Sequence, residues 1–587
     1  MADRGASIPE FMPLLMPEGH YDVAVLGGGL AGLSIGLQLV RERPGTRVLV
    51  AEKRADPPRE AAFKVGESTV ENGAHYYREV IGMRDHLEER QIRKLGLRFF
   101  LPAGDKSDIT KRIEFCTPGH LNAFTHQIDR GRFENELFDR NLRLGVDAVR
   151  GFRVLDVDFG EPHKVKLGYD GGEVEITARW VVDAAGRANI VRNKLGLQDE
   201  TGHHINASWL RLQGGLDFEE WGADDEEWLS RMPERGLRLY STTHLIDAGY
   251  WLWLIQLASG PISIGVCADP RFHPFEEINT LDGFIDWMKR EEPQLGREID
   301  ARRADIMDFL RVEDFSYAST RVISSDRWAL VGEAGGFIDA FYSPGSDFIA
   351  YTNTFSTECI KADLDGTADL EETADFYNDF FFRLFNPTIS LYRDQYQLFK
   401  NPQIMVAKIV YDSMNYFTCL GSPFVHGQMR TREQIERLTP VVEEVIPLIP
   451  VVQEFFREWH SKFQLEYQGV SVLSKDFESY IHVQEELGHP AEGEELLERT
   501  KKNTKVVKAY ITWLLFKACR TCGIATPDET RPLNLERISL DPSRWESELY
   551  ADEGMSYQQA LAALPGVEEM DLEARGAVLP EDAVVAE

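Results

Sequence analysis

The chain has 587 residues, too many for one ordinary hydrophobic core, so we expect two or three domains. Hydrophobic residues make up 43%, as in a globular protein, and a formal net charge of −33 argues against nucleic acid or an anionic membrane as partner. The six cysteines are too few for a disulfide scaffold, and the lone C-x-x-C pair Cys519 and Cys522 indicates two thiols rather than zinc ligands. We therefore expect a cytoplasmic protein without a metal site. Residues 1–20 carry charges and prolines, so neither a signal peptide nor a membrane span is expected there.

The strongest motif combines a strand, a glycine-rich turn and a helix near the N-terminus. An apolar run at 23–26 predicts a buried parallel strand, and a helix is expected over 33–41. A second strand at 47–51 delivers Glu52, an acid suited to bonding a ribose hydroxyl. A tight turn is the alternative, but the features in register favour a dinucleotide site. The glycines have G-x-G-x-x-G spacing, and the site takes in their neighbours: Gly27, Gly29, Leu30, Ala31, Gly32 and Lys53.

Strands and helices continue to about residue 365, after which the pattern becomes helical. We predict strands at 90–101, 180–185 and 328–331, with a helix from Asp129 to about 144. A second set of strands is predicted at 209–216, 237–245, 251–256 and 262–266, followed by a helix at 281–290. The expected fold class is α/β, with a discontinuous Rossmann-like nucleotide domain (20–110, 120–200 and 320–365) and a β-rich substrate domain (205–320). A helical C-terminal domain (366–540) and an acidic, partly disordered tail (541–587) complete the chain.

Three separated motifs together resemble the FAD-binding set of the class A flavoprotein monooxygenase fold. They are the unit at 27–52, the run Asp183-x-x-Gly186-Arg187, and the run that begins Gly332-Glu333. The resemblance implies FAD as cofactor and these residues as its contacts. Arg130, in an Asp-Arg-x-x-Phe pattern, occupies the place of a flavin-contacting arginine in that family. A surface ion pair is the alternative for Arg130.

Further segments resemble flavin-dependent halogenases of the phenol and pyrrole type. The run 65–69 is similar to their Gly-Glu-Ala/Ser-Thr loop beside the flavin, which implies that Ser68 and Thr69 contact the cofactor. The run 251–256 is similar to their W-x-W-x-I-P stretch, and 337–345 to the loop that holds halide. Lys94, followed by Gly96 and Phe99, matches a Lys-x-Gly-x-x-Phe signature. In that alignment Lys94 is the active-site lysine.

The resemblance implies an FADH2-dependent halogenase that oxidises chloride or bromide through a flavin C4a-hydroperoxide. O2 and a halide are then co-substrates, a separate flavin reductase is a partner, and the substrate is an electron-rich aromatic, free or carrier-tethered, in natural-product biosynthesis. Backbone N–H groups of Gly345 and Ser346 are candidates for holding the halide, although the same residues also suit a simple turn. Lys94 would direct the hypohalous acid. Trp251 and Trp253 face one side of a strand, either as core residues or as a wall between flavin and substrate.

Several positions depart from the halogenase pattern. Gln256 stands where the family has proline, Glu333 replaces an aspartate, and Glu71 and Ala340 also replace prolines. Tyr342 occupies the position of a glutamate in tryptophan halogenases, which argues against free tryptophan as the substrate. These departures keep a flavin hydroxylase or oxidase on a halogenase-like scaffold as the alternative. A nucleotide-binding protein without catalysis is a third reading, which the density of flavin motifs disfavours.

Overall fold

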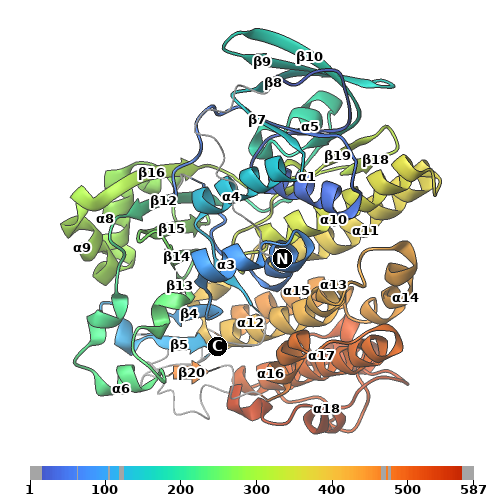
Figure 1. The fold of residues 1–587 in the computed structure, drawn as a ribbon. Coiled ribbons are helices and arrows are strands. Elements are labelled where there is room, and N and C mark those ends of the chain that lie inside the picture. The colour runs from blue at the N-terminus through green and yellow to red at the C-terminus, as the bar shows by residue number, and fades with distance from the viewer. Residues whose placement is uncertain are drawn as a thin grey trace.

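The computed structural model describes residues 16–61, 64–103, 106–117, 124–463, 471–473 and 478–570. Most of residues 1–20, where we expect neither a signal peptide nor a membrane span, therefore lie outside the described residues. The described chain forms two large sheets and a mainly helical C-terminal region (Figure 1). In the described residues, no helix is long and apolar enough to cross a membrane.

The first sheet contains the predicted nucleotide-binding unit. Its strand order is β18-β19-β10-β1-β2-β7, with β9 pairing β10 and β8 pairing β9. The strands β1, β2, β7, β10 and β19 run parallel, so the strands predicted near Val23, Val181 and Leu330 do share one sheet. The bounds are β1 His20–Leu26, β2 Val48–Glu52, β7 Asp147–Arg150, β8 Arg153–Asp158, β9 His163–Tyr169, β10 Gly172–Asp183, β18 Ile323–Ser324 and β19 Trp328–Leu330.

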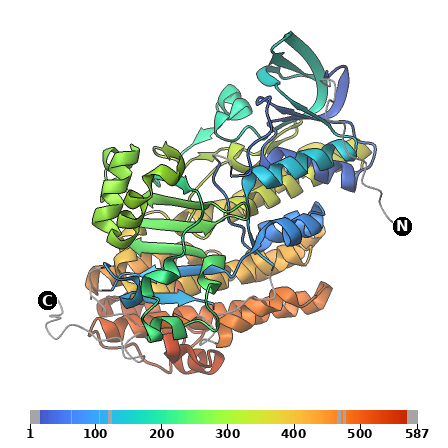
Figure 2. The same ribbon diagram turned by 60° about the vertical axis from the view of Figure 1, so that its left-hand side comes forward.

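The second sheet forms the β-rich layer beside the first one. Its order is β16-β12-β15-β14-β13-β4-β5-β20. Two of its strands, β4 and β5, come from residues 97–116, which lie outside the predicted range 205–320, and β20 comes from the helical region. Figure 2 shows β4 and β5 beside the later strands, above the C-terminal helices. The bounds are β4 Leu97–Leu101, β5 Ile113–Cys116, β12 Asn206–Leu212, β13 Thr242–Asp247, β14 Tyr250–Gln256, β15 Ile262–Ala268, β16 Ile306–Val312 and β20 Ser471–Leu473.

The strand predicted over 90–101 is interrupted in the structure. Only β3 (Ile92–Arg93) and β4 (Leu97–Leu101) are strands, and β3 pairs with β6 (His126–Gln127) in a separate small sheet. Gly96 has φ +84°, a left-handed conformation that ends the extended run. Lys94 therefore lies in the connection between two sheets. Another small sheet pairs β11 (Gln198–Asp199) with β17 (Ala318–Ser319).

Helices cover the first sheet and build the C-terminal region. α1 packs against α4 and α10, α8 packs against α9, and α12 packs against α15, α16 and α17. The bounds through residue 301 are α1 Leu30–Glu42, α2 Glu71–His75, α3 Arg84–Arg90, α4 Arg130–Arg143, α5 Ile190–Leu195, α6 Glu226–Ser230, α7 Phe275–Ile278, α8 Leu281–Glu291 and α9 Pro293–Ala301. The later bounds are α10 Gly345–Asp365, α11 Leu370–Ser390, α12 Pro402–Tyr416, α13 Ser422–Val425, α14 Arg432–Val442, α15 Leu448–Lys462, α16 Glu478–Glu485, α17 Gly493–Thr521 and α18 Tyr557–Ala563.

Residues 541–570, the first part of the predicted partly disordered tail, fold onto the helical region. α18 packs on α17, and the Tyr557 ring stacks on Phe516 with centroids 3.9 Å apart. Arg520 also donates a hydrogen bond to the Tyr557 hydroxyl over 2.6 Å. The acidic composition did not indicate this packing, because a few buried side chains suffice to hold a short segment on a long helix. Residues 571–587 lie outside the described residues.

Candidate functional site

A large cavity opens at the carboxyl ends of β1, β2, β10 and β19. Its volume is about 730 Å³. Parallel α/β sheets bind ligands at this edge, outside the carboxyl ends of their strands. The residues that line it come from all three predicted motifs and include Gly27, Gly29, Leu30, Ala31, Glu52, Lys53, Gly186, Arg187 and Glu333.

Each glycine of the turn at the cavity meets a different steric requirement. Gly27 has φ +118°, and a Cβ there would lie 2.5 Å from the Ala184 carbonyl oxygen. A Cβ on Gly32 would collide with the Gly27 carbonyl, so Gly32 allows α1 to pack closely on the turn. A Cβ on Gly29 would meet nothing nearer than Lys64 Nζ at 3.7 Å. Gly29 therefore leaves open space in front of the N-terminus of α1, where a phosphate group is favoured.

Glu52 lies at the end of β2 and faces the same turn. Its carboxylate accepts hydrogen bonds from the Gly28 N–H over 3.1 Å and from the Arg54 N–H over 3.0 Å. These bonds fix the acid beside the cavity. A carboxylate at this position can bond a ribose hydroxyl and would repel a 2′-phosphate.

The second motif, Asp183-x-x-Gly186-Arg187, forms a turn at the edge of the cavity. The buried Asp183 carboxylate accepts hydrogen bonds from the Ala185 N–H over 2.9 Å and the Val191 N–H over 2.7 Å, and burial raises its pKa to about 6. Asp183 itself is outside the cavity lining. It shapes the turn that brings Gly186, with φ +58°, and Arg187 to the cavity.

The third motif, which begins Gly332-Glu333, also turns at a glycine with a positive φ. Gly332 has φ +57°, and its N–H donates to the Thr352 hydroxyl over 3.0 Å. The Glu333 side chain, which replaces the aspartate of the resembled pattern, faces the cavity, and its carbonyl accepts the Tyr317 hydroxyl over 2.7 Å. The longer acid thus lines the same cavity as the glycine turn, and its contact with a flavin stays a prediction.

Arg130 lies at the start of α4 and lines the cavity. It forms a buried ion pair with Glu134 over 2.6 Å and donates to the Val65 carbonyl. Arg130 therefore does form an ion pair, as the alternative expected, but a largely buried one rather than one on the surface. Its Nε is buried and has no hydrogen-bond partner among the described residues. An unpaired buried donor here fits a cofactor with acceptor atoms.

These features together fit FAD. The open space at Gly29 suits the pyrophosphate, Glu52 suits the ribose, and Arg130 supplies an unused donor. In the part of the chain that the structure describes, no group of three or more His, Cys, Asp or Glu residues could hold a metal ion.

Trp251 and Trp253 line this first cavity, on the face of β14. Trp251 Nε1 donates to the Tyr396 hydroxyl over 2.8 Å, and Trp253 Nε1 donates to the Ser263 hydroxyl over 3.1 Å. Neither tryptophan lines the second cavity described below, so both border the first cavity alone. Gln256 closes the β14–β15 hairpin, where its Nε2 donates to the Gly260 carbonyl over 2.8 Å. This departure from proline therefore does not reach the flavin cavity.

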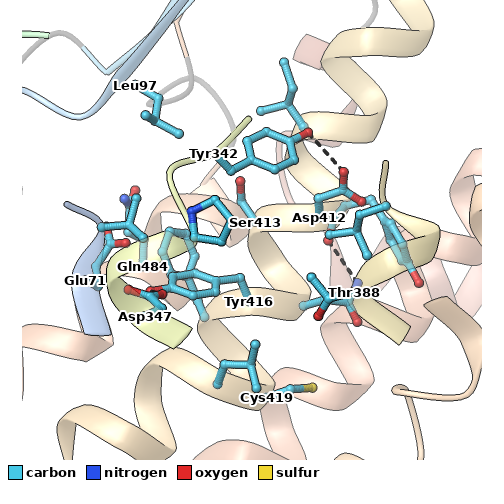
Figure 3. Close-up of a pocket in the computed structure, with 18 of the residues that line it drawn as sticks. Glu71, Leu97, Tyr342, Asp347, Thr388, Asp412, Ser413, Tyr416, Cys419 and Gln484 are labelled. Carbon is cyan, nitrogen blue, oxygen red and sulfur yellow. Dashed lines mark hydrogen bonds between the residues drawn. The ribbon is translucent and has the colours of Figure 1, made fainter. Parts of the chain in front are cut away.

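A second, smaller cavity of about 160 Å³ lies next to the first. It lies among β4, α2, the start of α10 and the helices α11 and α12, and Figure 3 shows it from within. Most of its lining is aromatic or aliphatic, including Leu97, Phe99, Phe115, Phe348, Tyr351, Leu384, Leu391, Tyr392, Ile409 and Tyr480. Its polar lining includes Glu71, Lys94, Tyr342, Asp347 and Asp412. We interpret it as the substrate cavity.

Lys94 connects the two cavities. Its side chain lines the second cavity, while its Nζ donates to the Ser68 hydroxyl over 2.9 Å and to the Thr69 carbonyl over 2.7 Å. Ser68 lines the first cavity, whereas Thr69 lies behind it and bonds His126. Lys94 is 4% exposed, and burial lowers its pKa to about 8. Lys94 is therefore not a solvated surface lysine.

The predicted halide loop separates the two cavities. Tyr342 and Ser343 have φ +69° and +61°, an uncommon conformation for two successive residues that are not glycine. Their side chains consequently face different cavities, with Tyr342 in the second and Ser343 in the first. Gly345 and Ser346 follow as the first residues of α10 and line the first cavity. This helix N-terminus favours an anion.

Three carboxylates in the second cavity were not predicted as site residues. Asp347 lies one residue after Ser346, and Asp412 belongs to α12, far away in the sequence. Glu71 was noted only because it replaces a proline. Burial raises the pKa of Asp347 to about 7 and also raises the pKa of Glu71. A carboxylate next to the halide loop was detectable from the sequence, but the position of Asp412 depends on tertiary packing.

Comparisons with known proteins agree with this site. Residues 20–260 match a family model described as FAD binding domain. The flavin-dependent halogenase chlA of Dictyostelium discoideum is 27% identical over 444 residues, which cover 69% of this chain and 71% of that protein. The 1H-pyrrole-2-carbonyl peptidyl-carrier-protein chlorinase of Pseudomonas fluorescens is 25% identical over 353 residues, covering 56% of this chain and 73% of the relative.

Solved structures share the fold. Halogenase PltM in complex with phloroglucinol and FAD aligns with a TM-score of 0.59 at 15% identity, covering 88% of this chain and 98% of that one. The FAD motifs, the FAD-binding match and the halogenase relatives agree with one another. The chain is therefore similar in sequence to flavin-dependent halogenases, contains a segment that matches the FAD binding domain, and shares its fold with solved halogenases.

Proposed function

We propose that the protein is an FADH2-dependent halogenase that halogenates an electron-rich, phenolic or pyrrolic ring with chloride or bromide. The observation that carries this proposal is Lys94, which lines the substrate cavity and hydrogen-bonds Ser68 of the flavin cavity. A hydroxylase that transfers oxygen directly to its substrate needs no such lysine. Reduced FAD with O2 would supply the power to oxidise a halide to hypohalous acid.

The residues of this chain have distinct roles in the proposal. The N–H groups of Gly345 and Ser346, at the N-terminus of α10, hold the halide in the first cavity. Trp251 and Trp253 form an apolar wall that excludes water from the flavin ring. Lys94 receives the hypohalous acid and directs it to the ring through an N–H hydrogen bond or by forming a haloamine.

The size of the second cavity supports a small aromatic substrate. Its volume is about 160 Å³, and a cavity of about 150 Å³ lined by apolar residues holds a benzene ring. The aromatic lining suits ring contacts. A single-ring substrate, free or presented on a carrier, therefore fits better than a fused polycyclic one. Relatives named for a carrier-bound pyrrole and solved with phloroglucinol support the same class.

The proposal includes a separate flavin reductase, because only one dinucleotide fingerprint is visible in the sequence. It also includes a cytoplasmic location, which suits six cysteines that form no disulfide within the described residues.

The deciding experiment is mass spectrometry of candidate phenols and pyrroles incubated with the protein, FAD, a flavin reductase, NADH and bromide. We expect monobrominated product that depends on bromide and O2. Hydroxylated product alone, whatever halide is present, would replace the halogenase proposal with a monooxygenase.

A further inference from the structure

The carboxylates of the second cavity differ in what the protein already bonds to them. Asp347 accepts hydrogen bonds from the Gly73 N–H over 2.7 Å and from the Tyr416 hydroxyl over 2.6 Å, one on each oxygen. Its two oxygens thus hold α2 and α12 against the start of α10. Asp347 is engaged in joining these elements and is a poor candidate for binding a substrate.

Asp412 is engaged in a similar way. Its Oδ1 accepts from Gln453 Nε2 over 2.7 Å, and its Oδ2 accepts from Lys408 Nζ over 2.7 Å and from the Tyr342 hydroxyl over 3.0 Å. Figure 3 shows Asp412 and Tyr342 on one side of the cavity, away from Glu71, Asp347 and Gln484. A buried ion pair of this kind orients the Tyr342 ring and leaves little capacity for a ligand.

Glu71 is the remaining carboxylate, and Gln484 of α16 lies on the same side of the cavity, as Figure 3 shows. The Gln484 side chain also lines the cavity, and its Oε1 is a second acceptor there. This oxygen is buried, in a side chain 6% exposed, and no residue that the structure describes donates to it.

A buried acceptor without a donor among the described residues therefore lies on the same side of the aromatic cavity as the Glu71 carboxylate. An unsatisfied buried acceptor is costly, and a ligand that donates a hydrogen bond removes that cost. A cationic ligand is disfavoured, because the Lys94 ammonium acts on the same carboxylate. A neutral donor on an aromatic ring fits both observations.

We propose that Glu71 and Gln484 select the substrate by accepting a hydrogen bond from a hydroxyl or N–H group on its ring. This inference rests on the proposed halogenase function and names the chemistry of its substrate. A hydroxyl bonded to a carboxylate gives the ring more electron density. The ring carbon attacks the halogen of hypohalous acid, the carbon–halogen bond forms, the oxygen–halogen bond breaks, and the departing hydroxide with the ring proton makes water.

Equilibrium binding tests this assignment without turnover. The oxidised, FAD-loaded protein is titrated by calorimetry with phenol and with toluene, which is nearly the same shape but lacks the donor. A hydrogen bond to a charged acceptor corresponds to a preference of about tenfold or more for phenol in the wild type. Glu71→Leu should abolish this preference, and Gln484→Leu should reduce it.

Two further variants control for folding. Glu71→Gln keeps an acceptor oxygen and should retain part of the preference, and Asp85→Asn, at an exposed position of α3, should retain all of it. An equal affinity for phenol and toluene in the wild type, or an unchanged preference in Glu71→Leu, overturns the assignment.

Failure of the halogenase function is detected separately. A 1,3-dione that traps hypohalous acid in solution reports oxidation of the halide independently of the aromatic cavity. Unhalogenated dione and unhalogenated phenol would overturn the proposed function. Halogenated dione, together with a loss of the preference for phenol in Glu71→Leu, would support the halogenase function and assign substrate selection to Glu71.

Discussion

Lys94 Nζ donates a hydrogen bond to the Ser68 hydroxyl over 2.9 Å, and this bond joins the two cavities of the molecule. Ser68 borders the flavin cavity, and the Lys94 side chain borders the aromatic one. The Ser68 hydroxyl is also hydrogen-bonded to Thr242 at the start of β13, over 2.8 Å. The lysine is therefore held between the loop that carries Ser68 and the second sheet.

Substitution of Lys94 separates halogenation from flavin chemistry. Lys94→Ala should leave FAD content and the reaction of reduced flavin with O2 intact while abolishing halogenated product. Lys94→Arg should fail as well, because a planar guanidinium is bulkier and does not form a haloamine in the same way. Mass spectrometry measures the halogenated product, and flavin absorbance serves as the control for FAD content. A native rate of halogenation in Lys94→Ala would remove this residue from the site.

The buried lysine also predicts how stability depends on pH. Burial lowers the pKa of Lys94 from 10.5 to about 8, so between these values the unfolded chain holds a proton that the native protein lacks. Stability should therefore rise with pH in this window relative to Lys94→Met, by about 3 kcal/mol in total. Denaturant titrations of both proteins at pH 7.5 and 10.5 measure this difference. A constant difference would mean that Lys94 keeps an ordinary pKa.

Gly29 tests the assignment of the first cavity. A Cβ at this position has open space in the protein itself, so Gly29→Val should fold with a stability change within about 1 kcal/mol. The branched side chain would nevertheless occupy the approach of the pyrophosphate, and the protein should purify without flavin. Gly32→Val provides the contrast, since its side chain collides with the Gly27 carbonyl and should prevent folding. Normal flavin content in Gly29→Val would contradict the assignment.

The source of electrons gives another prediction. We expect NADH alone to leave the bound FAD oxidised, because Glu52 and the glycine turn form one dinucleotide fingerprint and FAD occupies it. Stopped-flow absorbance with and without a flavin reductase makes the comparison. Bleaching of the flavin by NADH at the rate of turnover would eliminate the need for a reductase.

The docked C-terminal segment should contribute to stability. Tyr557→Ala removes the ring stacked on Phe516 and the acceptor for Arg520, so we expect a loss of about 3 kcal/mol. Asp552→Asn, at an exposed position before α18, is the matched control. Thermal unfolding of the two variants beside the wild type measures the effect. Equal midpoints in all three would mean that α18 docks without stabilising the protein.

The sequence by itself determined the flavin-binding unit. A strand, a glycine turn, a helix and Glu52 follow one another within about thirty residues, and their hydrogen bonds are local. The parallel pairing of β1, β10 and β19 was also predictable, because each strand is a short apolar run that ends in a glycine turn. Lys94 was predicted as a site residue through its motif, but its place between two sheets was not predicted, since Gly96 interrupts the strand that the alternating pattern suggested.

Only the tertiary structure decided which residues complete the second cavity. Asp412 and Gln484 lie on helices α12 and α16, hundreds of residues from Glu71, and nothing in their local sequence distinguishes them from other helical polar residues. β4 and β5 likewise join the second sheet across a long chain separation. Sequence periodicity reports which face of an element is buried, whereas the partner of that face is selected by the packing of the whole chain. The glycine turn and Glu52 are therefore encoded locally, whereas the second cavity is created by packing the helical region against the sheets.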